Sequence, residues 1–173
     1  MKLQLTILTT GGTIEKIYNE RDGTLENRGS FVEDFISDHL RTPYLEIKVI
    51  QLMAKDSLEM TDKDRKKICQ NVVQESEKKR PVLVLHGTDT LEKSVRYCKK
   101  ETGIFLCRPV IFTGAMKPFG FRKSDALQNL TEAIALSQVL PVGVYLSFHS
   151  RLFEADNVRK NIGEGTFEMI FEK

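Results

Sequence analysis

The 173-residue sequence contains no tryptophan, only three cysteines and no apolar run that approaches the roughly 20 residues of a membrane span. A membrane protein is therefore not expected. Cys69, Cys98 and Cys107 are odd in number and form no C-x-x-C pair, which favours buried, reduced thiols over a disulfide framework and indicates a cytoplasmic protein. The apolar stretch at residues 1–9 is too short for the core of a secretory signal, so no targeting segment is expected.

An excess of either charge is also missing. The 26 lysines and arginines nearly balance 24 acidic residues, for a formal net charge of +2. This balance gives no reason to propose nucleic acid or a membrane surface as a partner and favours a small-molecule substrate. His39, His86 and His149 are scattered without the spacing of metal ligands, so structural or surface roles are expected and no metal site is predicted.

Short apolar segments rich in β-branched residues alternate with segments that carry helix signals. Strands are expected at residues 3–9, 45–52, 82–86, 109–113 and 142–147, and helices at 31–41, 61–79, 91–101 and 124–137. Ser30 and Glu33 have the spacing of a capping box, and Thr61 is an expected N-cap. The alternation predicts an α/β fold with a doubly wound parallel sheet, a flavodoxin- or Rossmann-like three-layer architecture of strand order 2-1-3-4-5. One domain over residues 1–173 is expected.

Two glycine-containing turns follow the first and third expected strands: TTGGTI at residues 9–14 and HGTDT at residues 86–90. In the predicted order these strands are neighbours at the switch point, where a crevice opens at the carboxyl edge of the sheet. Threonine hydroxyls from both turns are therefore expected to face one crevice. Two such threonines indicate a hydrolase that uses a hydroxyl nucleophile.

Simpler interpretations exist for each turn taken alone. A glycine pair after a first strand often binds phosphate, but neither G-x-G-x-x-G nor G-x-x-x-x-G-K-[ST] is present, which disfavours a nucleotide site. Residues 86–90 could be a strand end followed by a helix N-cap. The pairing of the two turns is what favours an active site.

Together with DSLEMT at residues 56–61 and TGAMKP at residues 113–118, these turns resemble the bacterial-type L-asparaginase family in their order and separations. The resemblance runs from Leu5 to about Phe167 and covers only the family's amino-terminal domain. The chain therefore resembles either a short, single-domain asparaginase or a fragment of a longer one. It implies an amidohydrolase that converts L-asparagine to L-aspartate and ammonia through an acyl-enzyme, with L-glutamine at most a weak substrate. No cofactor is implied.

The resemblance assigns Thr13 as the nucleophile that attacks the side-chain amide carbonyl, and Thr88, Asp89 and Lys160 as the group that supplies its base. Lys160 ends the segment DNVRK at residues 156–160, which is similar to the family's Asp-x-Val-x-Lys pattern. A lysine desolvated in a crevice can accept a proton. The alternative for Lys160 is a solvated lysine in a charged loop.

The resemblance also suggests how the substrate is bound. Asp89 would accept from the α-ammonium group, while the Ser57 hydroxyl and nearby main-chain amides would donate to the α-carboxylate. Main-chain NH groups of the turns at Gly12 and Gly87 are the expected oxyanion donors, because glycine lets the backbone approach closely. Leu58 stands where many family members have glutamine or serine, so only its main chain can donate. Ser57 could alternatively cap a turn.

Residues 10–29 are long for a connection without secondary structure and are predicted to form an active-site lid. The family's tyrosine that orients the nucleophile has no counterpart near Leu25, so Tyr18 is the candidate for this role. The apolar segment at residues 167–171 could form an edge strand or a contact between subunits, which favours a homo-oligomer. Leu58 and the restriction to one domain leave open a non-catalytic amino-acid-binding or regulatory module on the same fold.

Overall fold

The computed structural model describes residues 2–171 and is built around a six-stranded sheet in the order β4-β1-β5-β6-β7-β8. Five strands run parallel: β1 (Leu3–Gly11), β4 (Leu45–Lys55), β5 (Val82–Leu85), β6 (Val110–Thr113) and β7 (Val144–Phe148). They correspond to the five expected strands, and the α/β class is confirmed. The sixth strand, β8 (Arg151–Glu154), pairs antiparallel with β7 and was not expected.

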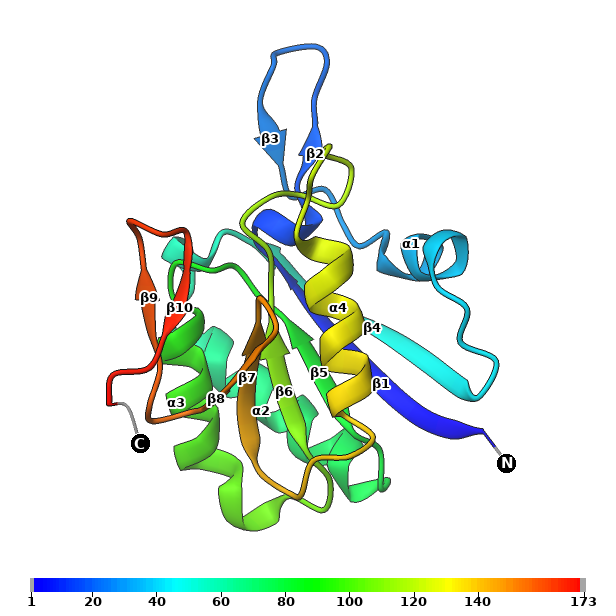
Figure 1. Cartoon of the computed structure of the whole chain (residues 1–173), viewed down its shortest axis with the longest axis vertical. Coiled ribbons are helices and arrows are strands. Elements are labelled where there is room, and N and C mark those ends of the chain that lie inside the picture. The colour runs from blue at the N-terminus through cyan, green and yellow to red at the C-terminus, as the bar shows by residue number, and fades with distance from the viewer. Residues whose placement is uncertain (1, 172–173) are drawn as a thin grey trace.

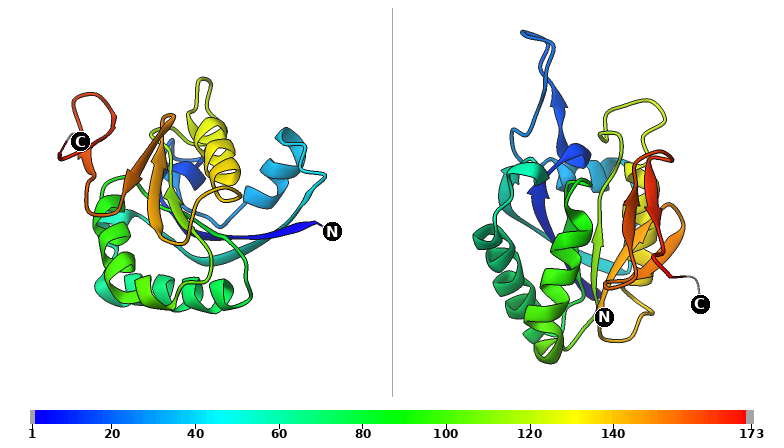
Figure 2. Two further views of the ribbon diagram at one scale, coloured as in Figure 1. Left: turned by 60° about the horizontal axis from the view of Figure 1, so that its bottom comes forward. Right: turned by 90° about the vertical axis from the view of Figure 1, so that its left-hand side faces the viewer.

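Helices cover both faces of this sheet (Figures 1 and 2). On one face lie α2 (Asp62–Glu77) and α3 (Leu91–Thr102), and on the other α1 (Val32–His39) and α4 (Ala126–Leu136). Helix α2 begins at the expected N-cap Thr61, whose hydroxyl accepts from the main-chain NH of Asp64 in a capping box. The capping box expected at Ser30 is wrong: α1 begins one residue later, after Phe31, without a side-chain cap.

The strand residues alternate between two hydrophobic cores because successive side chains point to opposite faces of a sheet. Val84 and Phe112 pack under α2 and α3, whereas Leu83, Leu85 and Ile111 pack under α1 and α4. All five side chains are fully buried. Burial on both faces explains why the central strands are continuous apolar runs, the pattern typical of parallel sheets.

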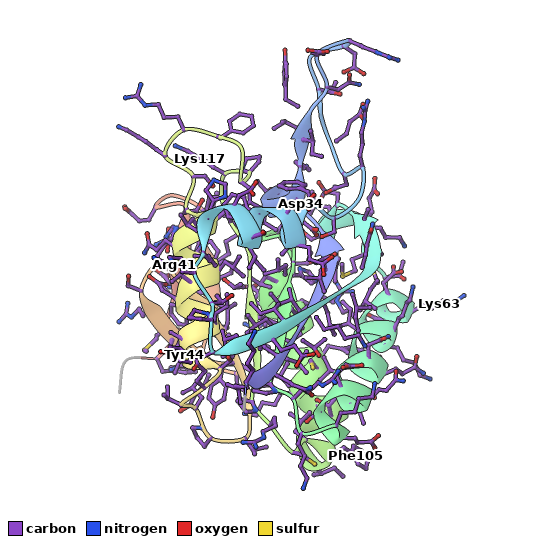
Figure 3. All side chains as sticks on the ribbon, turned by 90° about the vertical axis from the view of Figure 1, so that its right-hand side faces the viewer. Asp34, Arg41, Tyr44, Lys63, Phe105 and Lys117 are labelled. Atoms are coloured by element: carbon purple, nitrogen blue, oxygen red, sulfur yellow. The ribbon has the colours of Figure 1, made fainter. Side chains whose placement is uncertain are left out.

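The carboxyl ends of the parallel strands carry most of the irregular structure. After β1 come the 3-10 helix η1 (Thr13–Glu15) and a hairpin of β2 (Ile17–Tyr18) and β3 (Leu25–Glu26), which projects from the body. The segment at residues 10–29, in which no helix or strand was predicted, therefore contains a 3-10 helix and a β-hairpin. In Figure 3, Lys117 in the loop after β6 lies at the end of the molecule from which this hairpin rises, and Phe105 lies at the opposite end.

A second hairpin, β9 (Arg159–Asn161) with β10 (Thr166–Glu168), lies beside α3 (Figure 1). Phe167 on β10 is buried and contacts the Phe148 ring edge-on, with centroids 4.9 Å apart. Of the segment at residues 167–171, only Phe167 and Glu168 lie in a strand, which is paired within the hairpin, and Ile170 and Phe171 are exposed.

Two further expectations concern cysteines and membranes. Cys69 and Cys98 are buried free thiols, as expected, but the prediction of burial is wrong for Cys107, which is exposed. Among residues 2–171, no helix has the length and apolar character needed to cross a membrane.

Candidate active site

The turns after β1 and β5 touch each other through their backbones. A Cβ atom built on Gly12 would lie 2.3 Å from Cα of Gly87, a distance at which no side chain fits. Gly12 also has φ of 82° and ψ of −178°, a conformation that is essentially restricted to glycine. The structure therefore brings the two threonine-bearing turns together at one edge of the sheet.

A third turn, η2 (Ser57–Glu59) after β4, packs against the second. A Cβ atom on Gly87 would lie 2.7 Å from Cβ of Ser57, and the Thr90 hydroxyl donates to the Ser57 carbonyl at 2.8 Å. Ser57 is 1% exposed, and its hydroxyl has no hydrogen-bond partner within residues 2–171. Leu58 is 72% exposed. The Ser57 side chain thus lies beneath the turn, and Leu58 forms the outer surface.

Lys160 reaches the second turn from β9. Its Nζ donates to Oγ1 of Thr88 at 2.9 Å and to Oδ1 of Asp89 at 2.6 Å. Thr88 is buried, and the Lys160 side chain is only 17% exposed, so Lys160 is not a solvated surface lysine. The three residues that the resemblance grouped together are in direct contact. We call them the Lys160 cluster.

Thr13 is the first residue of η1, beside the contact between Gly12 and Gly87. Its side chain is half-buried and makes no hydrogen bond with another residue in the described range 2–171. The hydroxyl is thus not engaged elsewhere. Tyr18, in contrast, is 58% exposed on the projecting hairpin, with its hydroxyl near Gly23 at the hairpin turn. The structure does not bring Tyr18 to the Lys160 cluster.

The two glycines differ as candidate oxyanion donors. The main-chain NH of Gly12 donates to the carbonyl of Lys55 on β4 at 2.9 Å, so this NH is already engaged within the chain. The NH of Gly87 makes no hydrogen bond within the part of the chain that the structure describes. Gly12 therefore contributes to the site by letting the two turns approach closely. The main-chain NH of Gly87 remains available as a donor.

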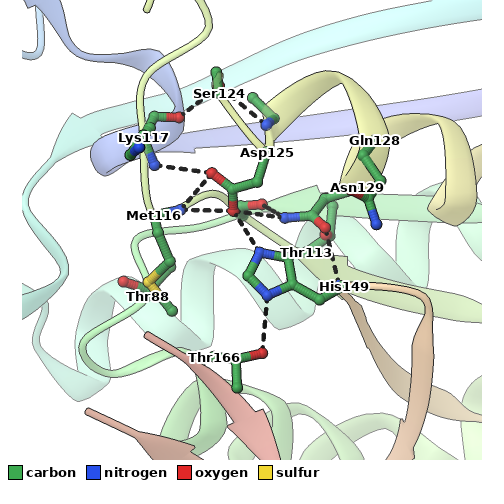
Figure 4. Close-up of polar contacts among 12 residues, drawn as sticks. Thr88, Thr113, Met116, Lys117, Ser124, Asp125, Gln128, Asn129, His149 and Thr166 are labelled. Carbon is green, nitrogen blue, oxygen red and sulfur yellow. Dashed lines mark hydrogen bonds and ion pairs between the residues drawn. The ribbon is translucent and has the colours of Figure 1, made fainter. Parts of the chain in front are cut away.

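The loop after β6 is held by a polar network that sequence reasoning missed (Figure 4). The Asp125 carboxylate accepts from the main-chain NH groups of Met116 and Lys117, both at 2.9 Å, and lies 3.0 Å from Nε2 of His149. Nδ1 of His149 in turn lies 2.9 Å from the Thr166 hydroxyl on β10. Burial opposes ionisation of Asp125, but these hydrogen bonds outweigh it and lower its pKa. The network links the β6 loop to the hairpin that carries Lys160.

Glu15 is a buried group that the sequence did not mark, because charged residues in a loop normally face solvent. It is 2% exposed, and its Oε2 accepts from the main-chain NH of Gly11 at 2.9 Å. Burial raises the pKa of the Glu15 carboxyl to about 7, although the hydrogen bond from Gly11 favours the ionised form. A carboxyl that gains or loses its proton near neutral pH thus lies two residues after Thr13.

Replacing Glu15 with glutamine is expected to stabilise the protein above pH 7. The folded protein keeps a proton on Glu15 that the unfolded chain, with its ordinary pKa of 4.5, has already lost at neutral pH. The contribution of protonated Glu15 to the free energy of unfolding is therefore full below pH 4.5 and is lost as the pH rises through about 7. Glu15→Gln should therefore gain up to about 3 kcal/mol in the free energy of unfolding at pH 8, with little gain at pH 4.5. Urea denaturation at both pH values measures this difference.

The variant must be compared with wild type at each pH, because His86 changes the free energy of unfolding with pH in the direction opposite to Glu15. Its ring is fully buried, and burial lowers its pKa from 6.5 to about 4. Its contribution is full above pH 6.5 and is lost as the pH falls toward 4. His86 is present in both proteins, so its effect cancels. A gain for Glu15→Gln that is equal at both pH values would contradict the assignment.

Within residues 2–171, no group of three or more histidine, cysteine or acidic side chains is arranged to hold a metal ion.

A groove of about 360 Å³ lies between the β2–β3 hairpin and the loop after β6, lined by Lys16, Ile17, Tyr18, Phe31, Gly120 and Phe121. The hairpin therefore stands apart from that loop.

Comparison with known proteins assigns most of the chain to one family. Residues 4–167 match the family described as "Asparaginase, N-terminal". L-asparaginase 1 of Escherichia coli is 26% identical over 180 residues, which cover 95% of this chain and 49% of that protein. L-asparaginase of Thermococcus kodakarensis is 25% identical over 181 residues, which cover 97% of this chain and 51% of that protein.

Solved structures agree with the sequence matches. The thermostable L-asparaginase from Thermococcus kodakarensis superposes with a TM-score of 0.85 at 24% identity, over 99% of this chain and 52% of that one. L-asparaginase I from Vibrio cholerae gives a TM-score of 0.79 at 24% identity, over 98% of this chain and 52% of that one. The chain spans about half the length of the curated relatives it matches.

Proposed function

This chain belongs to the asparaginase family, and we propose that it hydrolyses L-asparagine to L-aspartate and ammonia. The observation that carries the proposal is the Lys160 cluster, in which an amine lies 2.9 Å from a buried threonine hydroxyl and 2.6 Å from a carboxylate. The cluster is attached to the turn whose backbone touches the turn of Thr13. A hydroxyl nucleophile needs a base, and this arrangement supplies one.

In the proposed acylation step, Oγ1 of Thr13 attacks the carbon of the side-chain amide. In this step Lys160 acts as a neutral amine: Thr13 gives its proton to Thr88, Thr88 gives its own hydroxyl proton to the lone pair of Nζ, and Nζ still donates to Asp89. The new C–O bond makes a tetrahedral intermediate with a negatively charged oxygen. The main-chain NH of Gly87 is the candidate donor to this oxygen. The C–N bond then breaks as the nitrogen takes the proton from Lys160 by way of Thr88 and leaves as ammonia, so that Thr13 carries an ester and Lys160 is again a neutral amine.

Water completes the proposed reaction. It attacks the ester carbon while the Lys160 cluster removes a proton, and collapse of the second tetrahedral intermediate returns the proton to Oγ1 of Thr13. The products are L-aspartate and the free hydroxyl. The base that activates Thr13 thus also activates water, as general acid–base catalysis requires when a covalent intermediate is formed and then cleaved.

Recognition of the substrate is assigned to the second and third turns. The Asp89 side chain is 44% exposed and can accept from the α-ammonium group while it still contacts Lys160. The unpaired Ser57 hydroxyl costs about 1–3 kcal/mol in a buried position, and a carboxylate oxygen that reached it would remove this cost. The Leu58 side chain can offer only apolar contact. These features support a substrate that carries both an α-ammonium and an α-carboxylate group.

The competing candidate, a non-catalytic module that binds an amino acid on the same fold, is favoured by Leu58 at the outer surface. The test is ammonia release from L-asparagine, with L-glutamine alongside, and the melting temperature measured in the same samples. The hydrolase should give saturable ammonia release, with glutamine the poorer substrate. A rise in melting temperature with L-asparagine and no release of ammonia would contradict the proposal.

The cellular setting belongs to the same proposal. We expect residues 1–173 to form one catalytic domain. We also expect this domain to work in the cytoplasm, because Cys69 and Cys98 are free thiols. A homo-oligomer stays a prediction. It is supported by the exposed Phe171, but Phe167 is buried within its own chain and is not available for contact with a partner.

A further inference from the structure

Helix α3 presents a row of charged side chains to the chain segment that leads to Lys160. Glu92 and Arg96 are four residues apart and therefore lie on the same face of the helix. Oε2 of Glu92 accepts from the main-chain NH of Lys160 at 2.5 Å, and Nη2 of Arg96 donates to the carbonyl of Val158 at 2.5 Å. The helix thus binds the backbone of this segment at two points, two residues apart.

A third contact continues the row. Lys99, three residues after Arg96, forms an ion pair with Asp156. Both partners are well exposed, so this pair is worth little by itself. The contact of Glu92 is different, because it is only partly exposed and joins a charged acceptor to a main-chain donor.

Glu92 completes a closed set of contacts around Lys160. It lies in the first turn of α3, three residues after Asp89. The main chain of Lys160 is tied to Glu92, while its amine is tied to Thr88 and Asp89. Both ends of the lysine are therefore held by one short stretch of chain, residues 88–92. The place of Nζ relative to Thr88 depends on where Glu92 holds the backbone.

We propose that Glu92 is a positioning residue that holds Lys160 at hydrogen-bond distance from Thr88. As a statement about catalysis this rests on the proposed function. The other strand of the hairpin has its own anchors, since Thr166 contacts His149 and Phe167 packs on Phe148. Loss of the Glu92 contact therefore displaces the backbone at Lys160 without releasing the hairpin.

Three variants test this by kinetics of ammonia release from L-asparagine. Glu92→Ala removes the acceptor and should lower kcat at least about tenfold with little change in KM, since misplacement by about 1 Å can cost a hundredfold in rate. Glu92→Gln keeps a side-chain oxygen that accepts from the NH of Lys160 and should restore most of the activity. Glu101→Ala, an exposed glutamate at the other end of α3, should match wild type.

Two kinetic results would overturn the proposal. If Glu92→Ala keeps the wild-type kcat, the contact does not position Lys160. If Glu92→Gln falls as far as Glu92→Ala, Glu92 acts through its charge and not by holding the backbone.

A second measurement does not depend on turnover. In the ligand-free protein, NMR should show the amide proton of Lys160 far downfield and slow to exchange, because it is bonded to a carboxylate. In Glu92→Ala it should move upfield and exchange at least about tenfold faster, with Glu101→Ala unchanged. If wild type releases no ammonia but the amide responds in this way, the contact stands and the hydrolase proposal fails. An amide that does not respond overturns the role of Glu92, whatever the activity.

Discussion

Replacing Lys160 with methionine is expected to slow ammonia release from L-asparagine by at least about a hundredfold, or about 2.7 kcal/mol of barrier. Methionine keeps an unbranched apolar chain of similar length but cannot accept or return a proton. The variant also leaves the buried Thr88 hydroxyl without the partner it has at 2.9 Å. The effect should therefore fall on kcat, and initial rates at saturating L-asparagine measure it.

The same substitution at a solvent-exposed lysine provides the control. Lys93 lies on α3 and is exposed, so Lys93→Met should behave as wild type. If Lys160→Met keeps more than about a tenth of the wild-type rate, another group is the base, because removal of a general base normally costs at least about a hundredfold. The contact of Lys160 with Thr88 would then be structural.

Replacing Gly12 with alanine is expected to destabilise the protein strongly and abolish the site. The new Cβ would lie 2.3 Å from Cα of Gly87, and the turn cannot move away freely because its NH is bonded to Lys55. A backbone conformation that only glycine adopts costs about 1–3 kcal/mol with any other residue. Overpacking adds about 1–3 kcal/mol. The free energy of unfolding, measured by urea denaturation, should fall by about 2–6 kcal/mol.

Gly103 is the matched control for this substitution. Beyond its chain neighbours and the backbone of its own helix, no atom lies within 4 Å of a Cβ built there, and its φ of −49° suits any residue. Gly103→Ala should change the free energy of unfolding by less than about 1 kcal/mol, in the stabilising direction. Equal behaviour of the two variants would show that the turns of Gly12 and Gly87 are not in contact.

The central sheet could be predicted because its strands are buried on both faces. The segments that form β5 and β6 contain only apolar and β-branched residues, and helix signals separate them. Strand β8 gave no such signal. It follows β7 after a two-residue turn in which His149 and Ser150 take positive φ without any glycine. The sequence RLFE of β8 is also too short and mixed to stand out.

The site was predictable only in part. The glycines of the two turns mark the place where the backbones meet, and the sheet order brings them together. The contact of Lys160 with Thr88 joins residues that are 72 positions apart, and only the family resemblance indicated it. Glu15 and Asp125 were missed because a charged residue gives no sign that the fold will bury it, as it does Glu15, or half-bury it, as it does Asp125. Their hydrogen bonds to main-chain NH groups become evident only in three dimensions.

The central claim is that the Thr13 hydroxyl attacks the amide of L-asparagine. It is tested most directly by ammonia release from L-asparagine by wild type and Thr13→Ala, with Thr131→Ala, an exposed threonine on α4, as control. The account predicts saturable release by wild type and the control, and at least about a hundredfold less by Thr13→Ala. Equal release by wild type and Thr13→Ala, or none by wild type, would contradict it.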